Sequence, residues 1–316
     1  LDNLYRNLFV GYLLKKYAEQ PFTVLFITHD YSILSEIYNK YKNLLDRMHF
    51  REFHREHDNK VNIKDFSAND YLGWMNSLKQ DSSSGPQGQT VLRVNSSFNI
   101  FGRSLGIYGD PDHKRPQDLV IHKGEAVYVK APSGEGKTTL ANIIMGLFKA
   151  EKFSMSLAEF KITHRSKKEI WSSKIWGKKA SMVFQHADEA LNPESTVMEA
   201  FTGLPLGNRL TYETLGPKLG ELFDEEIDQA FMHKKVAFLS GGQKQRLNLL
   251  RTLILNTDLI ILDEPLNGLD FESIKKVLSI LDEKRNSGSA ILIISHNEEI
   301  FERVIESGNV YYLKSN

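Results

Sequence analysis

The sequence predicts an α/β domain with a mostly parallel sheet, because strand-like and helix-like segments alternate along it. Apolar runs at 259–262 and 290–295 are interpreted as buried strands, with helix-like stretches between such runs. The strand-like segment 125–130 is followed by a glycine-rich turn and by a helix that begins near Gly136. A run of turn-forming residues at 81–89 is interpreted as a surface loop or linker in front of this domain.

The composition is that of an ordinary soluble globular protein, with 41% hydrophobic and 25% charged residues among 316. Forty basic residues balance forty acidic ones, so a nucleic-acid partner is not expected. The lack of cysteine excludes disulfides and thiolate metal sites. No apolar run approaches the roughly 20 residues of a membrane helix, and no signal segment opens the sequence. We therefore expect a cytoplasmic protein that reaches the inner face of a membrane only through a partner.

A phosphate-binding loop is predicted at 131–139, Ala-Pro-Ser-Gly-Glu-Gly-Lys-Thr-Thr. Glycines let backbone N–H groups turn toward a phosphate, and the following helix points its N-terminus at the negative charge. Lys137 would neutralise the β- and γ-phosphates, and the Thr138 hydroxyl would bind Mg²⁺. Ala131 stands where this loop usually begins with glycine, which is tolerable if its φ is negative. The nucleotide-binding residues expected from the loop are Ser133, Gly134, Glu135, Gly136, Lys137, Thr138 and Thr139.

Two adjacent acids follow the apolar run at 259–262. A buried strand there would deliver Asp263 to the metal, directly or through water, and would place Glu264 beside the γ-phosphate. A carboxylate in that place can orient and polarise the attacking water. Such a pair is common in α/β enzymes, so it becomes informative only together with the other motifs.

A second anion site is predicted at 239–243, Leu-Ser-Gly-Gly-Gln, where a helix begins. Ser240 supplies a hydroxyl, and Gly241 and Gly242 supply backbone N–H groups at the positive end of the helix. The motif resembles the signature of the ATP-binding-cassette (ABC) family, and the 23 residues from Ser240 to Asp263 fit the same family. The resemblance implies nucleotide binding by Ser240, Gly241, Gly242 and Gln243.

Other elements of the ABC family follow in order. Gln185 resembles the glutamine that contacts Mg²⁺ and links the site to the helical subdomain, and 267–270 resembles the loop that crosses the dimer interface. His296 resembles the switch histidine that contacts the γ-phosphate. Tyr108 lies about where the family places an aromatic ring against adenine, with Phe101 as the alternative.

The resemblance covers residues 91–316 and implies a P-loop NTPase core with a mostly parallel sheet, an antiparallel β subdomain and a helical signature subdomain. It also implies a split site, in which the phosphate loop of one domain faces the signature loop of another, with ATP and Mg²⁺ between them. A second ABC ATPase domain is therefore an expected partner. The catalytic residues implied are Glu264, His296 and Gln185, and the metal-binding residues are Thr138, Gln185 and Asp263.

An internal repeat connects the two ends of the sequence. Residues 23–30, Thr-Val-Leu-Phe-Ile-Thr-His-Asp, match residues 290–297, Ala-Ile-Leu-Ile-Ile-Ser-His-Asn, and a Leu-Asp pair precedes each histidine at nearly the same distance. Because a parallel strand needs neighbours, we expect the rest of a first domain upstream or on another chain. An unrelated strand ending in histidine is the alternative. The expected organisation is a C-terminal fragment of a preceding ABC ATPase domain at 1–45, a connector at 46–90 and a complete ABC ATPase domain at 91–316.

Three further features have ordinary explanations. The segment 161–179 carries seven basic residues against one acid, and a solvated face of the β subdomain is favoured over a patch for nucleic acid or lipid. Trp171 and Trp176 are expected to pack within that subdomain rather than to bind a ligand. Loose spacing disfavours a metal site at the histidines His49, His54 and His57.

The stretch after Gln185 continues to Leu-Asn-Pro at 191–193, which resembles importer ATPases of the oligopeptide, dipeptide and nickel type and their soluble relatives. We therefore expect a domain that hydrolyses Mg-ATP and energises transport through a membrane permease. The alternative is a soluble tandem ABC ATPase that remodels or activates a protein complex. A scaffold that binds nucleotide without hydrolysis is disfavoured because Glu264 and His296 are both present.

Overall fold

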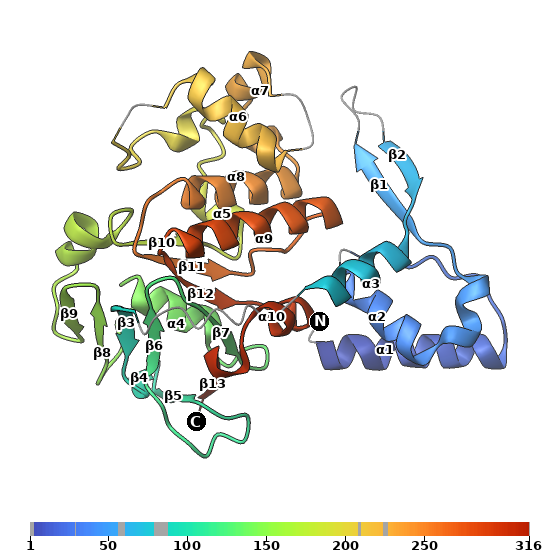
Figure 1. The fold of residues 1–316 in the computed structure, drawn as a ribbon, viewed down its shortest axis with the longest axis horizontal. Helices are drawn as coiled ribbons and strands as arrows, with labels where there is room; N and C mark the ends of the chain where they lie inside the picture. The colour runs from blue at the N-terminus through green and yellow to red at the C-terminus, as the bar shows by residue number, and fades with distance from the viewer. Residues whose placement is uncertain are drawn as a thin grey trace. The chain divides into compact units, whose positions relative to one another are not determined.

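The structure is a computed structural model that describes residues 3–28, 30–55, 61–78, 88–207, 210–223 and 227–315. The chain forms two compact units (Figure 1). The large unit comprises Asp81–Ser295 and Ile305–Asn316, and the small unit comprises Leu1–Gln80 and His296–Val304. No helix within the described ranges is long and apolar enough to cross a membrane.

The large unit is built around a seven-stranded sheet. In sheet order its strands are β10 (Ala180–Val183), β11 (Leu259–Asp263), β12 (Ala290–Ile294), β7 (Ala126–Lys130), β13 (Val310–Ser315), β5 (Arg103–Tyr108) and β4 (Ser97–Ile100). The first five strands are parallel, and β5 and β4 continue the sheet antiparallel. All residues of β11 and β12 are buried, as expected for strands covered on both faces. This arrangement confirms the predicted α/β fold with a mostly parallel sheet.

A four-stranded antiparallel sheet in the same unit confirms the predicted β subdomain. In sheet order its strands are β6 (Leu119–His122), β3 (Thr90–Val94), β8 (Ser154–Leu157) and β9 (Phe160–Thr163). These strands share one hydrophobic core with α4 (Lys137–Ile144), the helix after the glycine-rich turn. Trp171, which begins η2 (Trp171–Ile175), donates from its indole N–H to the Ile144 carbonyl at 3.1 Å. Trp176 donates likewise to the Met145 carbonyl at 2.9 Å, so both indoles pack at the end of α4.

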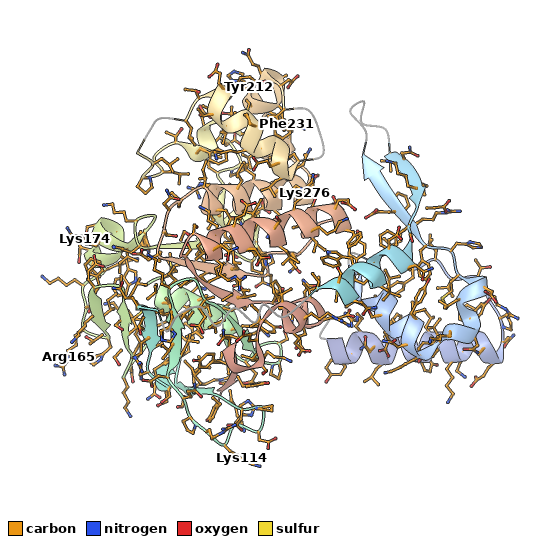
Figure 2. All side chains as sticks on the ribbon, viewed as in Figure 1. Lys114, Arg165, Lys174, Tyr212, Phe231 and Lys276 are labelled. Atoms are coloured by element: carbon orange, nitrogen blue, oxygen red, sulfur yellow. The ribbon has the colours of Figure 1, made fainter. Side chains whose placement is uncertain are left out.

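The other helices of the large unit include the predicted helical subdomain. In chain order they are α5 (Ala187–Ala190), η3 (Glu199–Phe201), α6 (Tyr212–Leu222), α7 (Gln229–His233), η4 (Val236–Phe238), α8 (Gly241–Leu253), α9 (Phe271–Asn286) and η5 (Ser307–Asn309). Tyr212 and Phe231 lie on α6 and α7, at the top of Figure 2. The Tyr212 hydroxyl donates to the Ile227 carbonyl at 2.8 Å, and the Phe231 ring meets Phe223 edge-on at 5.3 Å. Polar and aromatic contacts thus join α6 to α7 just before the signature.

The small unit combines helices with one β hairpin. In chain order it contains α1 (Asn3–Glu19), α2 (Ser32–Lys40), η1 (Lys42–Arg47), β1 (Arg51–Arg55), β2 (Val61–Asp65), α3 (Ala68–Ser77) and α10 (Glu298–Val304). Val10, Ile33 and Ile37 form a core between α1 and α2. The order of helix, apolar segment and helix in α1–α2 matches the order α9, β12, α10, as the sequence repeat leads one to expect. The histidine of the first copy, His29, lies outside the described residues.

The segment 23–27, interpreted from the repeat as a strand of a preceding domain, forms no strand in this chain. Residues 21–28 have no regular secondary structure, and the side chains of Leu25 and Ile27 are 85% and 73% exposed. A strand needs partners for its N–H and C=O groups and cover for its apolar side chains. No strand of the described part of the chain pairs with this segment. An apolar sequence alone is therefore not enough to form a strand here.

The connector predicted at 46–90 is more than a linker. It contains the hairpin β1–β2 and helix α3. Ser67 caps α3 by accepting a hydrogen bond from the Asp70 N–H at 3.2 Å. Tyr71 and Met75 on this helix are fully buried, so the segment contributes to the core of the small unit. Most of the turn-forming run, residues 81–87, lies outside the described residues.

The contact between Gly146 and Trp171 provides a stability test of the large unit. A Cβ at Gly146 would lie 2.3 Å from the indole ring, and the φ of Gly146 is 69°. We expect Gly146→Ala to lower the free energy of unfolding by about 2–5 kcal/mol in urea denaturation, because steric overlap adds to backbone strain. Gly102→Ala is the matched control, since its φ is 75° but a Cβ there meets nothing within 4 Å. Equal losses in the two variants would contradict the packing described.

Candidate nucleotide-binding site

The phosphate-binding loop connects β7 to α4 and uses the conformational freedom of its glycines. Gly134 and Gly136 have φ angles of 83° and 94°, in the left-handed region that favours glycine. A Cβ at Gly136 would also lie 3.0 Å from Leu105 Cδ1, so a larger residue would not fit without movement. Ala131 is not among the residues with positive φ, which explains why alanine is tolerated there.

Lys137 begins α4 and folds back over the loop. Its Nζ donates hydrogen bonds to the backbone carbonyls of Ala131 and Pro132, and the residue is 7% exposed. On the other side of the loop, Glu135 Oε2 accepts a hydrogen bond from the Ser315 N–H of β13 at 2.8 Å. The lysine charge is thus held against neutral carbonyls, where a phosphate would be a stronger partner. The remaining loop residues differ in burial: Ser133 and Gly134 are exposed, and Glu135, Gly136, Thr138 and Thr139 are half-buried.

Asp263 ends the buried strand β11 and is completely buried. Neither of its carboxylate oxygens accepts a hydrogen bond within the described residues. Burial raises the pKa of Asp263 to about 6, and the nearby Thr138 hydroxyl and Lys137 oppose this shift. A buried carboxylate that lacks a donor and lies beside a threonine hydroxyl suits a hard cation such as Mg²⁺, which prefers oxygen ligands. The structure thus brings together two of the three predicted metal ligands.

Glu264 follows Asp263 and is 2% exposed. Its φ of 51° is unusual for a residue other than glycine, and such strain collects at functional sites. The Ser295 hydroxyl donates to Glu264 Oε2 at 3.1 Å, and the Glu264 N–H donates to the Ile294 carbonyl at 2.8 Å. The end of β12 therefore fixes the position of this carboxylate.

The sequence assigns no role to Ser295 or to Tyr128, although both support Glu264. The Tyr128 hydroxyl donates to the Ser295 carbonyl at 2.8 Å in the buried interior. The recurrence of a hydroxyl residue before each histidine of the repeat is a signal that could have pointed to Ser295. Tyr128 gives no such signal, because it lies within the strand-like run of β7.

Helix α8 holds the chain around Gln185. The Asn248 side-chain amide donates to the Phe184 carbonyl at 3.1 Å, immediately before Gln185. Lys244 Nζ forms an ion pair with Asp188 at 2.8 Å, three residues after it. Gln185 itself is half-buried after the end of β10. The predicted glutamine loop is therefore connected to the signature helix.

Ser240 caps α8 and remains at the surface. Its Oγ accepts a hydrogen bond from the Gln243 N–H at 3.2 Å, and the Gln243 side-chain oxygen accepts one from the Ser240 N–H at 3.0 Å. Ser240 and Gly241 are exposed, whereas Gln243 is 7% exposed. The Ser240 hydroxyl can still donate its hydrogen to an anion outside. The side chain of Gln243, predicted to bind nucleotide, is engaged in the cap.

The signature also touches the loop at 267–270. A Cβ at Gly242 would lie 3.0 Å from the Gly268 carbonyl, so the two backbones approach closely. Arg246 of α8 forms an ion pair with Asp270, the N-cap of α9. Its Nε donates to the Ser273 hydroxyl at 3.0 Å. Two of the motifs predicted to face a partner are thus held together within one chain.

The two candidates for the adenine contact have different surroundings. Tyr108 ends β5, and its ring covers Gly106, where a Cβ would lie 2.8 Å from the ring. It also meets the His113 ring edge-on at 5.1 Å. Phe101 is 76% exposed in the turn between β4 and β5, with its ring 5.5 Å from Phe148. The adenine contact stays a prediction for Tyr108, with Phe101 as the alternative.

His296 follows β12 by two residues and is half-buried. It belongs to the small unit, whereas Ser295 belongs to the large unit. The contact of this histidine with a γ-phosphate therefore stays a prediction.

Known proteins are similar to this chain in sequence and in fold. Residues 115–267 match the family model described as ABC transporter. The cell division ATP-binding protein FtsE of Bacillus subtilis is 33% identical over 187 residues, which are 58% of this chain and 78% of FtsE. The chain belongs to the ABC ATPase family. ATP hydrolysis by cassette domains is the reaction of that family.

Other relatives of this ABC ATPase carry transport names. The oligopeptide transport ATP-binding protein OppF of Lactococcus lactis is 32% identical over 184 residues, 57% of this chain and 56% of OppF. The nickel import ATP-binding protein LarO of Lactiplantibacillus plantarum is 28% identical, over 63% of this chain and 82% of LarO. A dimeric cassette structure in a post-hydrolysis state with ADP and Pi shares the fold, with a TM-score of 0.56 and 24% identity over 71% of this chain and 94% of that one. The chain thus spans about half the length of OppF.

Lys137→Ala should weaken ATP binding by about 10- to 100-fold, because a buried phosphate charge loses its partner. Titration with a fluorescent ATP analogue measures this affinity. Lys149→Ala removes the same charge from an exposed position after α4 and should leave the affinity unchanged. If the Lys137 variant binds as tightly as this control, residues 131–139 are not the phosphate site.

Glu264→Gln should lower ATP turnover by at least about 100-fold and leave ATP affinity nearly unchanged, because it keeps the shape but loses the group that positions water. Phosphate release at saturating ATP measures turnover. Glu283→Gln makes the same charge change at an exposed position of α9 and serves as the control. Turnover in the Glu264 variant equal to that of the control would exclude Glu264 as the base.

Proposed function

We propose that the large unit binds Mg-ATP and hydrolyses it by closing onto a second ABC ATPase domain. The observation that carries this proposal is the exposure of the signature. Ser240 and Gly241 open the 13-residue helix α8 at the surface, whereas Lys137, Asp263 and Glu264 are buried. A hydroxyl, free backbone N–H groups and the positive end of a helix suit a phosphate that another domain presents.

The residues around the phosphate loop would act on the nucleotide of their own domain. Lys137 would hold the β- and γ-phosphates, and Glu264 would orient the attacking water. His296 would contact the γ-phosphate. Bound Mg²⁺ would neutralise phosphate charge, and Thr138, Gln185 and Asp263 are the residues that would hold it.

We further propose that this cycle drives transport through a membrane permease. The names of OppF, an oligopeptide transport ATP-binding protein, and LarO, a nickel import ATP-binding protein, support this proposal. The helical part between residues 191 and 235 is the surface proposed to dock on the permease. Opening and closing of the ATP-bound pair would supply the movement.

The alternative is a soluble tandem ABC ATPase that acts on a protein complex without transport. It is favoured by the small unit, in which α1, an apolar segment and α2 repeat the order α9, β12, α10. Residues 1–45 would then belong to a second cassette domain, joined through 46–90 to the cassette at 91–316. A neighbouring gene for a multi-span permease would support transport, and co-purification with soluble enzymes would support the alternative.

Ser240→Arg should leave ATP binding intact and abolish ATP-dependent pairing, because Ser240 serves the nucleotide of the partner domain. The substitution is made in the Glu264→Gln background, where slow turnover keeps ATP bound. Size-exclusion chromatography with and without Mg-ATP measures pairing. Ser287→Arg, an exposed change at the end of α9, is the control and should still pair. ATP-dependent pairing of the Ser240 variant would refute the split site.

A further inference from the structure

Helix α10, which follows His296, belongs to the small unit. Strand β12, which precedes His296, belongs to the large unit. The segment His296–Val304, which contains α10, groups with Leu1–Gln80. Its neighbours in sequence on both sides, Ser295 and Ile305, belong to the large unit. Helix α10 is therefore joined covalently to the large unit at both ends while it is part of the other unit.

Helix α10 has buried apolar side chains and a polar contact with α3. The α10 residues Ile300 and Phe301 are 3% and 0% exposed. Arg303 Nη1 donates a hydrogen bond to the Met75 carbonyl of α3 at 3.3 Å. Tyr71, one turn earlier on α3, is fully buried. Burial, together with the Glu299 carboxylate of α10, raises the pKa of its hydroxyl. A hydrogen bond thus joins α10 to α3, and two apolar side chains of α10 are buried.

Glu299 of α10 lies near a cluster of polar and charged groups that includes the Ser35 hydroxyl of α2. Burial raises its pKa. The Ser35 hydroxyl, Arg303 and Arg6 oppose this shift, and Asp30 adds to it. Glu299 Oε2 and the Ser35 hydroxyl are buried and make no hydrogen bond within the described residues. Because buried charges are weakly screened, a small displacement of α10 would change these interactions strongly.

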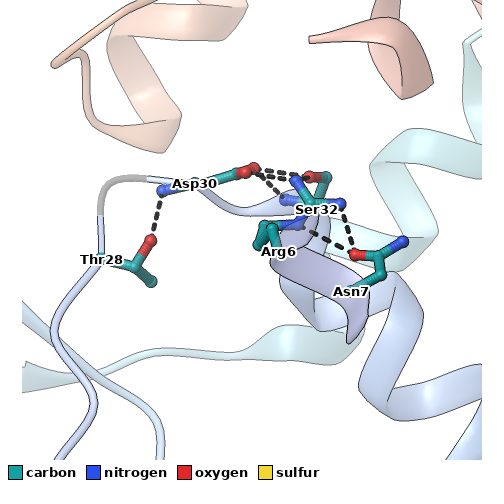
Figure 3. Close-up of polar contacts among 5 residues, drawn as sticks. All are labelled: Arg6, Asn7, Thr28, Asp30 and Ser32. Atoms are coloured by element: carbon teal, nitrogen blue, oxygen red, sulfur yellow. Dashed lines mark hydrogen bonds and ion pairs between the residues drawn. The ribbon is translucent and has the colours of Figure 1, made fainter. Parts of the chain in front are cut away.

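Arg6, which belongs to this cluster, makes several polar contacts (Figure 3). Arg6 is 8% exposed, forms an ion pair with Asp30 and donates to the Ser32 hydroxyl. Its Nη2 donates to Asn7 Oδ1 at 2.7 Å. The Ser32 N–H, at the start of α2, donates to Asp30 Oδ1 at 3.0 Å. The start of α2 is therefore held by several polar contacts.

We propose that the small unit senses and regulates the nucleotide site, with Arg303 and Glu299 as positioning residues that set the place of His296 through α10. The inference rests on the proposed function, because it takes His296 as the group that contacts the γ-phosphate. Glu299 and Arg303 lie three and seven residues after His296, in the same short segment. Helix α10 is the element whose position both the nucleotide and the small unit would bias. Reciprocity then requires ATP binding to alter the packing of α2 and α3.

Kinetics of Arg303 variants test the positioning role. Arg303→Ala should lower kcat by about 3- to 10-fold with KM for ATP changed less than about twofold. A displaced His296 would impair the hydrolysis step more than the binding of ATP. Arg303→Lys should restore kcat to within about twofold, since it keeps the positive charge and an N–H donor group. Arg47→Ala, an equal loss of charge at an exposed site of the small unit, is the control. A kcat for Arg303→Ala equal to that of this control, or a loss that lysine does not restore, would overturn the positioning role.

Hydrogen exchange tests whether ATP binding alters the packing of α2 and α3, in a protein that keeps Arg303. The 316-residue chain with Glu264→Gln is compared with and without Mg-ATP. We expect protection of peptides from the phosphate loop, and exchange in α2 and α3 that slows by about threefold or more. Adding His296→Ala should keep the first effect and remove the second. Protection of the loop with unchanged α2 and α3 would overturn the coupling and leave the proposed function intact. A loop without protection would overturn ATP binding and the coupling with it.

Discussion

The structure depends on two carboxylates that are buried side by side at the end of one strand. Asp263 and Glu264 are 0% and 2% exposed, and a buried carboxylate is costly unless nearby groups compensate its charge. Glu264 accepts a hydrogen bond from Ser295, while Asp263 has Thr138 and Lys137 nearby but no hydrogen bond within the described residues. The strand order β11, β12, β7 brings neighbouring groups to both carboxylates. It places the end of β12 beside Glu264 and brings the loop after β7 to the same edge of the sheet.

Helix α8 extends this constraint from the buried acids to the surface. Its first residues present the signature, while Asn248 holds the chain before Gln185 and Arg246 holds the N-cap of α9. A Cβ at Gly242 would lie 3.0 Å from the Gly268 carbonyl, so a side chain at this position of the signature would require that neighbour to shift. The groups proposed to meet a partner's nucleotide and those proposed to meet the domain's own nucleotide are thus attached to one rigid element. A displacement of α8 would affect both sites of a pair together.

Sequence motifs predicted the large unit well because each motif is also a local structural requirement. The glycines at 134 and 136 have the positive φ that the loop needs, and the apolar run at 259–262 is the fully buried strand β11. The small unit was less predictable. Helix α3 lies in a charged stretch interpreted as a connector, and its burial depends on Tyr71 and Met75, which local sequence does not distinguish. The packing of α10 with this unit could not be predicted from the sequence. It depends on contacts between residues more than 200 positions apart, such as Arg303 and Met75.

The two copies of the repeat show which parts of a motif can form without their neighbours. In the large unit the apolar segment is strand β12, which pairs with β11 and β7. The similar segment at 23–27 has no such partners among the described strands and stays irregular, because strand formation is a property of the sheet. The helices after the two histidine positions, α2 and α10, form in both copies, because a helix satisfies its own backbone hydrogen bonds. Both helices belong to the small unit, so the parts of the repeat that form without a sheet are found in the same unit.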